Sequence, residues 1–242
     1  MATSAKGSGF VGYNAQAAVE TESHLIVAHN VINAGHDREQ LSPMAKGAKA
    51  ALGRDEMSAV ADKGYFSGRE IQACHEDGIT TTLPRPETSG NRKKGMYVKA
   101  DFAYDADADI YRCPVGETLT YRYTTEEAGL VVRRYWASVC QTCPLKTNCT
   151  TGKQRRITRW EHEHLLDEMR NRMIRDPSLM ALRRSTAEHP FGTIKAWMGA
   201  THFRMRTLKN VRTEMAFHVL AYNIKRMITL IGVRGLLAAI PA

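Results

Sequence analysis

The sequence predicts a mixed α/β protein whose sheet-forming first third is separated from a helical last third by a segment of short strands and loops. Strand-like apolar runs alternate with amphipathic segments up to residue 86. Residues 87–160 contain no long periodic run, and residues 161–236 show helical periodicity. We therefore predict an α/β fold in three parts, with boundaries at residues 11–86, 87–160 and 161–236.

The first third predicts the order β-β-α-β-α-β, because short β-branched runs alternate with helical periodicity. The predicted elements are strands at 11–20 and 24–32, a helix at 38–52, a strand at 57–61, a helix at 68–77 and a strand at 79–83. Gly53 ends the first helix. Ser67 and Glu70 predict a capping box at the start of the second helix.

The last third predicts three helices. They are expected at residues 161–174, 177–197 and 211–231. Asp176 and Pro177 suit the N-cap and the first position of the second helix. Pro190 should kink that helix. Apolar side chains of the final helix are predicted to pack in the core: Met215, Phe217, Leu220, Ile224, Met227 and Ile228.

Composition and charge narrow the function classes. The start of the chain lacks a signal-peptide pattern, no apolar run is long enough to span a bilayer, and five cysteines are too few for a disulfide scaffold. Residues 1–150 contain 17 Lys and Arg against 18 Asp and Glu, whereas residues 151–242 contain 17 against 7. The basic part indicates a polyanionic partner such as nucleic acid, or else a solvated arginine-rich surface. The candidate contacts to a nucleic-acid phosphate backbone are Arg204, Arg206 and Lys209, with Arg212.

Two segments carry candidate catalytic side chains. Asp62 directly follows the predicted strand at 57–61, at the sheet edge where ligands collect, and an isolated carboxylate there can bind Mg²⁺. Capping of a turn is the alternative. On the later helix, Arg184, Glu188 and Lys195 share one face. They form either an exposed ion-pair ladder or a metal-binding Glu188 flanked by cations that hold phosphates.

Four segments together resemble bacterial insertion-sequence transposases of the DDE superfamily. They are GYNAQAAVETESHLIVAHNVINAGHDREQL, ADKGYFSGREI around Asp62, RRSTAEHPFGTIK around Glu188, and TEMAFHVLAYNIKRMI. The resemblance extends from Val11 to about Gly232. It implies a ribonuclease-H-like mixed sheet with flanking helices, interrupted here by a small cysteine-containing insertion. It also implies DNA strand cleavage and transfer by two divalent ions, Mg²⁺ or Mn²⁺, held by three carboxylates.

The resemblance assigns roles to particular residues. Asp62 would be the second carboxylate and Glu188 the third. Arg184 and Lys195 match a late-helix signature of the family and would hold DNA phosphates, whereas Ala181 stands where that signature has tyrosine.

The resemblance also implies a first catalytic Asp on a strand upstream of the GYN hairpin. Residues 1–10 contain no acid, so we expect a C-terminal portion of a transposase that is inactive alone. Its expected partners are element ends and target DNA, with a second copy at paired ends, in the bacterial cytoplasm at the nucleoid. One alternative is a catalytically inactive DNA-binding remnant. Another is a stand-alone nuclease in which Glu20, Glu22 or Asp37 replaces the missing acid.

The cysteines of the insertion form a second constellation. Cys140 and Cys143 are a C-x2-C pair, and Cys113 and Cys149 lie on either side. A tetrahedral Zn²⁺ site needs such a pair and two further thiolates from nearby loops. The four residues therefore predict a structural zinc, with reduced thiols as the alternative. Cys74, outside the insertion, is expected to be a small core residue.

Overall fold

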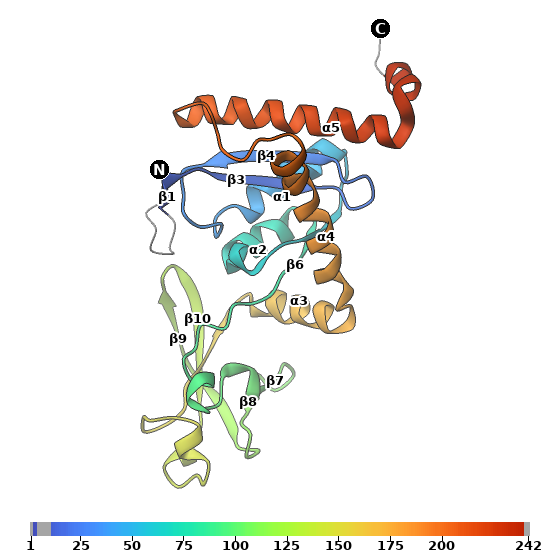
Figure 1. Ribbon diagram of the computed structural model, residues 1–242. Coiled ribbons are helices and arrows are strands. Elements are labelled where there is room, and N and C mark those ends of the chain that lie inside the picture. Colours follow the sequence, from blue (N-terminus) through green and yellow to red (C-terminus); the bar gives the residue numbers. More distant parts are fainter. Residues whose placement is uncertain (1, 4–10, 240–242) are drawn as a thin grey trace. The chain divides into compact units, whose positions relative to one another are not determined.

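The computed structural model describes residues 2–3 and 11–239 as a mixed α/β chain (Figure 1). The chain divides into two compact units. Unit 1 comprises residues 1–86 and 167–242, and unit 2 comprises residues 87–166. In chain order, unit 2 is therefore inserted into unit 1.

The first part of unit 1 confirms the predicted order β-β-α-β-α-β. Its elements are β3 (Asn14–Val19), β4 (Ile26–Ile32), α1 (Leu41–Leu52), β5 (Met57–Val60), α2 (Gly68–Glu76) and β6 (Ile79–Thr82), preceded by the short pair β1 (Ala2–Thr3) and β2 (Val11–Gly12). β3 and β4 form an antiparallel hairpin, and β5 and β6 form a parallel pair. These are separate two-stranded sheets.

Helix ends in this part follow local and tertiary contacts. α1 ends at Gly53, whose φ of 59° is left-handed and whose N–H donates to the Ala50 carbonyl. The predicted capping box of α2 is wrong, because the Ser67 side chain makes no capping hydrogen bond. Glu70 instead accepts a 2.9 Å hydrogen bond from the backbone N–H of Ser42 at the start of α1.

The later helices are α3 (Glu163–Arg175), α4 (Ser178–Gly192) and α5 (Leu208–Ala239), with a π-helical turn (Thr193–Trp197) after α4. α4 begins after Pro177, and the Asp176 carboxylate accepts the N–H of Ser178 at 3.1 Å. α4 contains Pro190, which is buried. α5 is broken at Gly232, where φ is 72° and ψ is 168°.

A hydrophobic core of unit 1 lies between α5 and the β3–β4 hairpin, along which α5 runs (Figure 1). The buried face of α5 follows helical spacing through Val211, Met215, Val219 and Tyr222. The core prediction for Met215 is therefore confirmed. It is wrong for Phe217, Leu220, Ile224 and Ile228, whose side chains are exposed, because they lie on the other faces of the same helix.

Unit 2 is built on one antiparallel sheet with the strand order β11-β10-β9-β8-β7. The strands are β7 (Ala103–Asp105), β8 (Ile110–Arg112), β9 (Thr118–Glu127), β10 (Leu130–Trp136) and β11 (Ile157–Trp160). β9 and β10 form a long hairpin with an irregular register at Arg134 and Tyr135. Buried residues on one side of this sheet, including Tyr111, Leu119 and Ile157, form the core of the unit.

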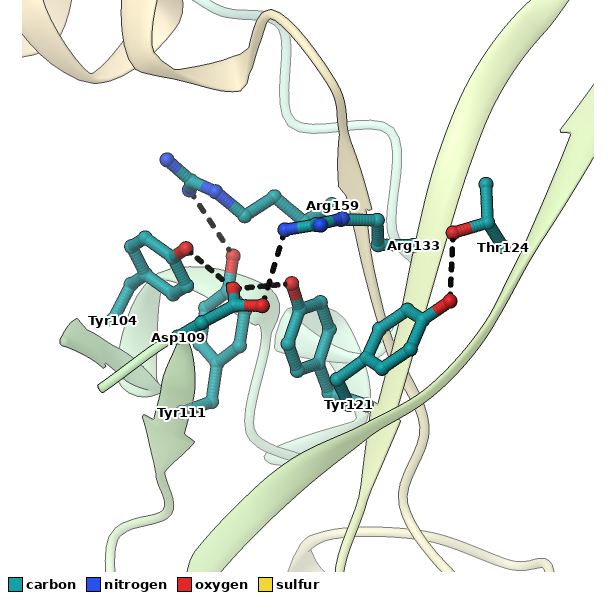
Figure 2. Close-up of polar contacts among 8 residues, drawn as sticks. Tyr104, Asp109, Tyr111, Tyr121, Thr124, Arg133 and Arg159 are labelled. Carbon is teal, nitrogen blue, oxygen red and sulfur yellow. Dashed lines mark hydrogen bonds and ion pairs between the residues drawn. The ribbon is translucent and has the colours of Figure 1, made fainter. Parts of the chain in front are cut away.

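A polar cluster adjoins that core, with Asp109 at its centre (Figure 2). Asp109 accepts 2.7 Å hydrogen bonds from the hydroxyls of Tyr104 and Tyr135. It also forms a 3.0 Å ion pair with Arg133. Burial alone would raise the pKa of Asp109, but the two hydroxyls and the nearby arginines outweigh it and lower the pKa. The Arg159 guanidinium lies 3.7 Å from the centre of the Tyr104 ring, a cation–π contact.

Candidate functional site

Unit 1 contains a cavity of about 690 Å³ that receives side chains from β3, α1, β5 and α4. The side chains from β3 are small, including Ala15 and Ala17, and α1 contributes apolar side chains such as Met44 and Leu41. The charged residues that line the cavity are Glu20, Asp37, Asp62, Arg183, Glu188 and Lys195. The fold therefore gathers titratable side chains from distant parts of the chain around one space.

Asp62 and Glu188, the two predicted catalytic carboxylates, lie on either side of the Arg183 guanidinium. Arg183 Nη1 is 3.8 Å from Asp62 Oδ2, and Arg183 Nη2 is 3.9 Å from Glu188 Oε1. The other oxygen of Asp62 accepts a 2.7 Å hydrogen bond from the N–H of Lys63 and so caps the short 3₁₀ turn after β5. Asp62 thus caps a turn and also faces the cavity.

Asp37, on the loop after β4, reaches the same cavity. Its Oδ1 accepts hydrogen bonds of 2.6 Å from Asn14 and 2.8 Å from Gln16. Gly64 approaches its Oδ2 so closely that an added Cβ would lie 3.2 Å away. Burial, followed by the negative charges of Asp37 and Asp62, raises the pKa of Tyr65 to about 12.

α4 and the turn after it supply the remaining polar groups. Lys195, on the π-helical turn, lines the cavity together with Glu188. Arg184 is exposed and is not among the lining residues, so its neighbour Arg183 provides the arginine of the cavity. Thr186 lines the cavity too, and its buried hydroxyl has no hydrogen-bond partner among the described residues. The sequence pattern did not single out Arg183, although the basic pair that it forms with Arg184 is visible in the sequence.

Residues 112–228 match the transposase DDE domain family. The match supports a transposase of the DDE superfamily. It contains Arg184, Glu188, Lys195 and the four cysteines of the insertion, and it begins after Asp62. No curated protein and no solved structure is significantly similar to the chain.

DDE transposase domains generally use divalent cations, so we tested whether the residues present could hold one. Within residues 2–3 and 11–239, no group of three or more His, Cys, Asp and Glu side chains could hold a metal ion. At Asp62 and Glu188, the guanidinium of Arg183 lies between the two carboxylates. In the arrangement shown, Asp62 and Glu188 are thus both paired with the Arg183 guanidinium.

In unit 2, the four cysteines Cys113, Cys140, Cys143 and Cys149 line one small cavity of about 30 Å³. Burial raises the pKa of Cys149, the nearby Arg155 opposes this, and the three other thiols add to it. No metal-holding group forms here among the described residues, so zinc stays a prediction. Cys74 is fully buried in unit 1, as expected for a core residue, and burial raises its pKa to about 11.

The candidate DNA contacts lie at the start of α5 and in the segment before it. Arg204, Arg206 and Lys209 are exposed. Arg212 instead donates a 2.8 Å hydrogen bond from Nε to the carbonyl of Val31 and so fixes α5 to β4. Burial alone would raise the pKa of Glu214, but hydrogen bonds from the backbone N–H groups of Arg204 and then Met205 outweigh this effect and lower the pKa.

No helix in the part of the chain that the structure describes combines the length and the apolar character needed to cross a membrane.

Proposed function

We propose that the chain is the C-terminal part of a bacterial insertion-sequence transposase, in which Asp62 and Glu188 serve DNA strand cleavage and transfer. The observation that carries this proposal is the cavity of unit 1, because Asp62 lines it together with Glu188 and Lys195, which lie far from Asp62 in the sequence. The match of residues 112–228 to the transposase DDE domain supports the same function.

We propose a ribonuclease-H-like fold for unit 1, which requires a further strand between β3 and β5. Among the described residues, β3 pairs with β4 alone and β5 pairs with β6 alone. The N–H of Met57 donates to the carbonyl of Gly78, directly before β6, at 3.3 Å, and that of Ala61 donates to the carbonyl of Thr82 in β6 at 3.1 Å. The backbone groups of Ser58 and Val60 therefore face the opposite edge of β5. These unpaired edges, together with the cavity that both sheets line, support a strand carrying the first Asp at this place.

Bound divalent cations would activate the attacking water or 3′-hydroxyl and stabilise the leaving oxygen. Asp62 and Glu188 are the residues of this chain that would hold the cations. Lys195, in the same cavity as Glu188, would hold a DNA phosphate by charge and without reading bases. The chain's own contribution is therefore to position the phosphate and the cations.

The proposed partners are the element ends and the target DNA, with a second copy of the chain at paired ends and association with the bacterial nucleoid. Exposed cations carry the DNA part of this proposal, namely Arg204, Arg206 and Lys209. Because phosphate contacts release counterions, binding should weaken steeply with salt.

The first experiment measures binding of a fluorescent DNA duplex over a range of salt concentrations. The triple change Arg204→Gln, Arg206→Gln and Lys209→Gln should lower the slope of log K against log salt by about 3. A matched control replaces Arg92, Lys93 and Lys94, on an exposed turn of unit 2, by glutamine. A slope that falls equally in both variants would contradict the assignment of these contacts.

The second experiment measures Mn²⁺-dependent nicking of supercoiled plasmid by the chain, with and without the segment encoded directly upstream of Met1. We expect nicking only with that segment, and loss of nicking in Glu188→Gln without loss of DNA binding. DNA binding without nicking by either form would instead support the inactive DNA-binding remnant.

A further inference from the structure

The contacts of Arg183 with Asp62 and Glu188 are electrostatic and loosely held. The distances of 3.8 and 3.9 Å exceed those of hydrogen bonds. The side chain of Arg183 is 22% exposed, whereas Asp62 and Glu188 are 53% and 67% exposed. Water therefore reaches both carboxylates, and the guanidinium can be exchanged for another cation without unpacking the core.

The Thr186 hydroxyl is a second polar group of the cavity. Thr186 is 4% exposed, and its Oγ1 has no hydrogen-bond partner among the described residues. It follows Arg183 by three positions on α4, so the two residues lie on the same side of the helix. A buried hydroxyl without a partner is costly. It can donate to an oxygen that enters the cavity from outside.

We propose that Arg183 is a counter-ion that takes the place of a divalent cation between Asp62 and Glu188 in the DNA-free chain. When a DNA phosphate enters the cavity, Arg183 moves to the phosphate and the Thr186 hydroxyl donates a hydrogen bond to it. The two carboxylates are then released to bind a divalent cation. Phosphate binding thereby favours cation binding, and the reverse also holds.

This inference rests on the cation site of the proposed function and does not depend on strand cleavage. It accounts for the contacts that one guanidinium makes with both predicted ligands. It also distinguishes two neighbouring arginines, because Arg184 is exposed and does not line the cavity.

The experiment measures Mn²⁺ binding to the full chain by electron paramagnetic resonance of free Mn²⁺. Arg183→Gln should bind Mn²⁺ about three- to tenfold more tightly than the unchanged chain, since it removes the competing cation. Arg170→Gln, which removes the same charge from an exposed side chain of α3 outside the cavity, should leave the affinity unchanged. Equal melting temperatures of the three proteins show that the fold is intact. Unchanged or weaker Mn²⁺ binding by Arg183→Gln would overturn the proposal.

Two further variants separate the parts of the argument. Adding Asp62→Asn and Glu188→Gln to Arg183→Gln should abolish the gain in affinity. If these changes have no effect, the cation site itself is wrong and the counter-ion proposal falls with it. If they weaken binding but Arg183→Gln matches the unchanged chain, only the counter-ion role is refuted.

The role of the phosphate is tested with a short DNA duplex, after subtraction of the Mn²⁺ that the duplex binds alone. DNA should raise the Mn²⁺ affinity of the unchanged chain and should raise that of Arg183→Gln less. Thr186→Val, which has nearly the same shape but no donor, should reduce the DNA effect and leave Mn²⁺ binding without DNA unchanged. An identical DNA effect in all three proteins would refute the transfer of Arg183 to phosphate.

Discussion

The hydroxyl of Tyr222 donates a 2.8 Å hydrogen bond to the backbone carbonyl of His24, and this bond fixes α5 to the turn of the β3–β4 hairpin. His189 Nδ1 lies 3.0 Å from the same hydroxyl. His24 has a φ of 58°, in the left-handed region that non-glycine residues rarely adopt. The bond therefore anchors a turn whose backbone is strained.

Tyr222→Phe should lower the free energy of unfolding by about 1–2 kcal/mol, because the ring stays buried while the His24 carbonyl loses its partner. Urea denaturation measures this change. Tyr121→Phe is the control, since Tyr121 is exposed and its hydroxyl is bonded only to Thr124 among the contacts described; its effect should stay within about 0.5 kcal/mol. Equal effects of the two changes would contradict the anchoring role.

Glu20 should make the hairpin turn sensitive to acid. Its carboxylate accepts hydrogen bonds from the Ser23 hydroxyl and from the N–H groups of Ser23 and Glu22, at 2.6, 2.6 and 3.0 Å. These bonds, led by that of the Ser23 hydroxyl, lower the pKa of Glu20 to about 2 from 4.5. Because the folded-state pKa is the lower one, the stabilisation is present above pH 4.5 and is lost as the pH falls towards 2.

Glu20→Gln is therefore expected to lower the free energy of unfolding by about 1 kcal/mol at pH 7, after allowance for solvent screening. The difference from the unchanged chain should shrink steadily below pH 4.5. Urea denaturation at a series of pH values measures it. Glu22→Gln is the control, because it removes the same charge from an exposed side chain of this turn. A difference that persists unchanged at pH 3 would refute the hydrogen-bonded carboxylate.

Two substitutions of Asp109 should destabilise unit 2 to different extents. Both tyrosine hydroxyls donate to Oδ1 and Arg133 contacts Oδ2, so Asp109→Asn can keep the first two bonds and loses the third. Asn also tolerates the φ of 50° at this position. We expect a loss of about 1 kcal/mol for Asn and about 2–3 kcal/mol for Ala. Hydrogen exchange of the β9 and β10 amides measures it, and equal protection in both variants would contradict the cluster's role.

Purified protein is predicted to contain about one zinc ion per chain, held by the four cysteines of unit 2. Elemental analysis should show that Cys143→Ser loses this zinc. Cys74→Ser should retain it, because Cys74 is buried in unit 1 and lies outside the cavity that the four thiols share. A zinc content well below one per chain would refute the site and favour reduced thiols.

Where local sequence decides the conformation, the sequence predicted the structure. Gly53 ends α1 with a left-handed φ, which glycine adopts easily. The identity of this single residue is therefore enough to predict the end of the helix. The capping box at Ser67 failed because Glu70 found a partner on another helix, the backbone N–H of Ser42. A contact between residues 28 positions apart leaves no local pattern.

The residues of the candidate site divide in the same way, into those that local motifs predict and those that depend on tertiary structure. Asp62, Glu188 and Lys195 could be selected from motifs, and all three line the cavity. The sequence indicated Arg184, whereas Arg183 lines the cavity, because the difference depends on how α4 is rotated against the rest of unit 1. On α5, apolar residues occupy more than one face, so the sequence alone did not show that Phe217 would be exposed.

Among the described residues no strand pairs with the edge of β5 opposite β6, and this edge affects how the protein behaves in concentrated solution. The backbone groups of Ser58 and Val60 form a template onto which a strand of a neighbouring molecule can add, and such additions propagate into aggregates. The formal net charge of +9 keeps molecules apart by repulsion. Salt screens that repulsion and leaves strand pairing intact, so the chain should remain clear in dilute buffer and cloud as the ionic strength is raised.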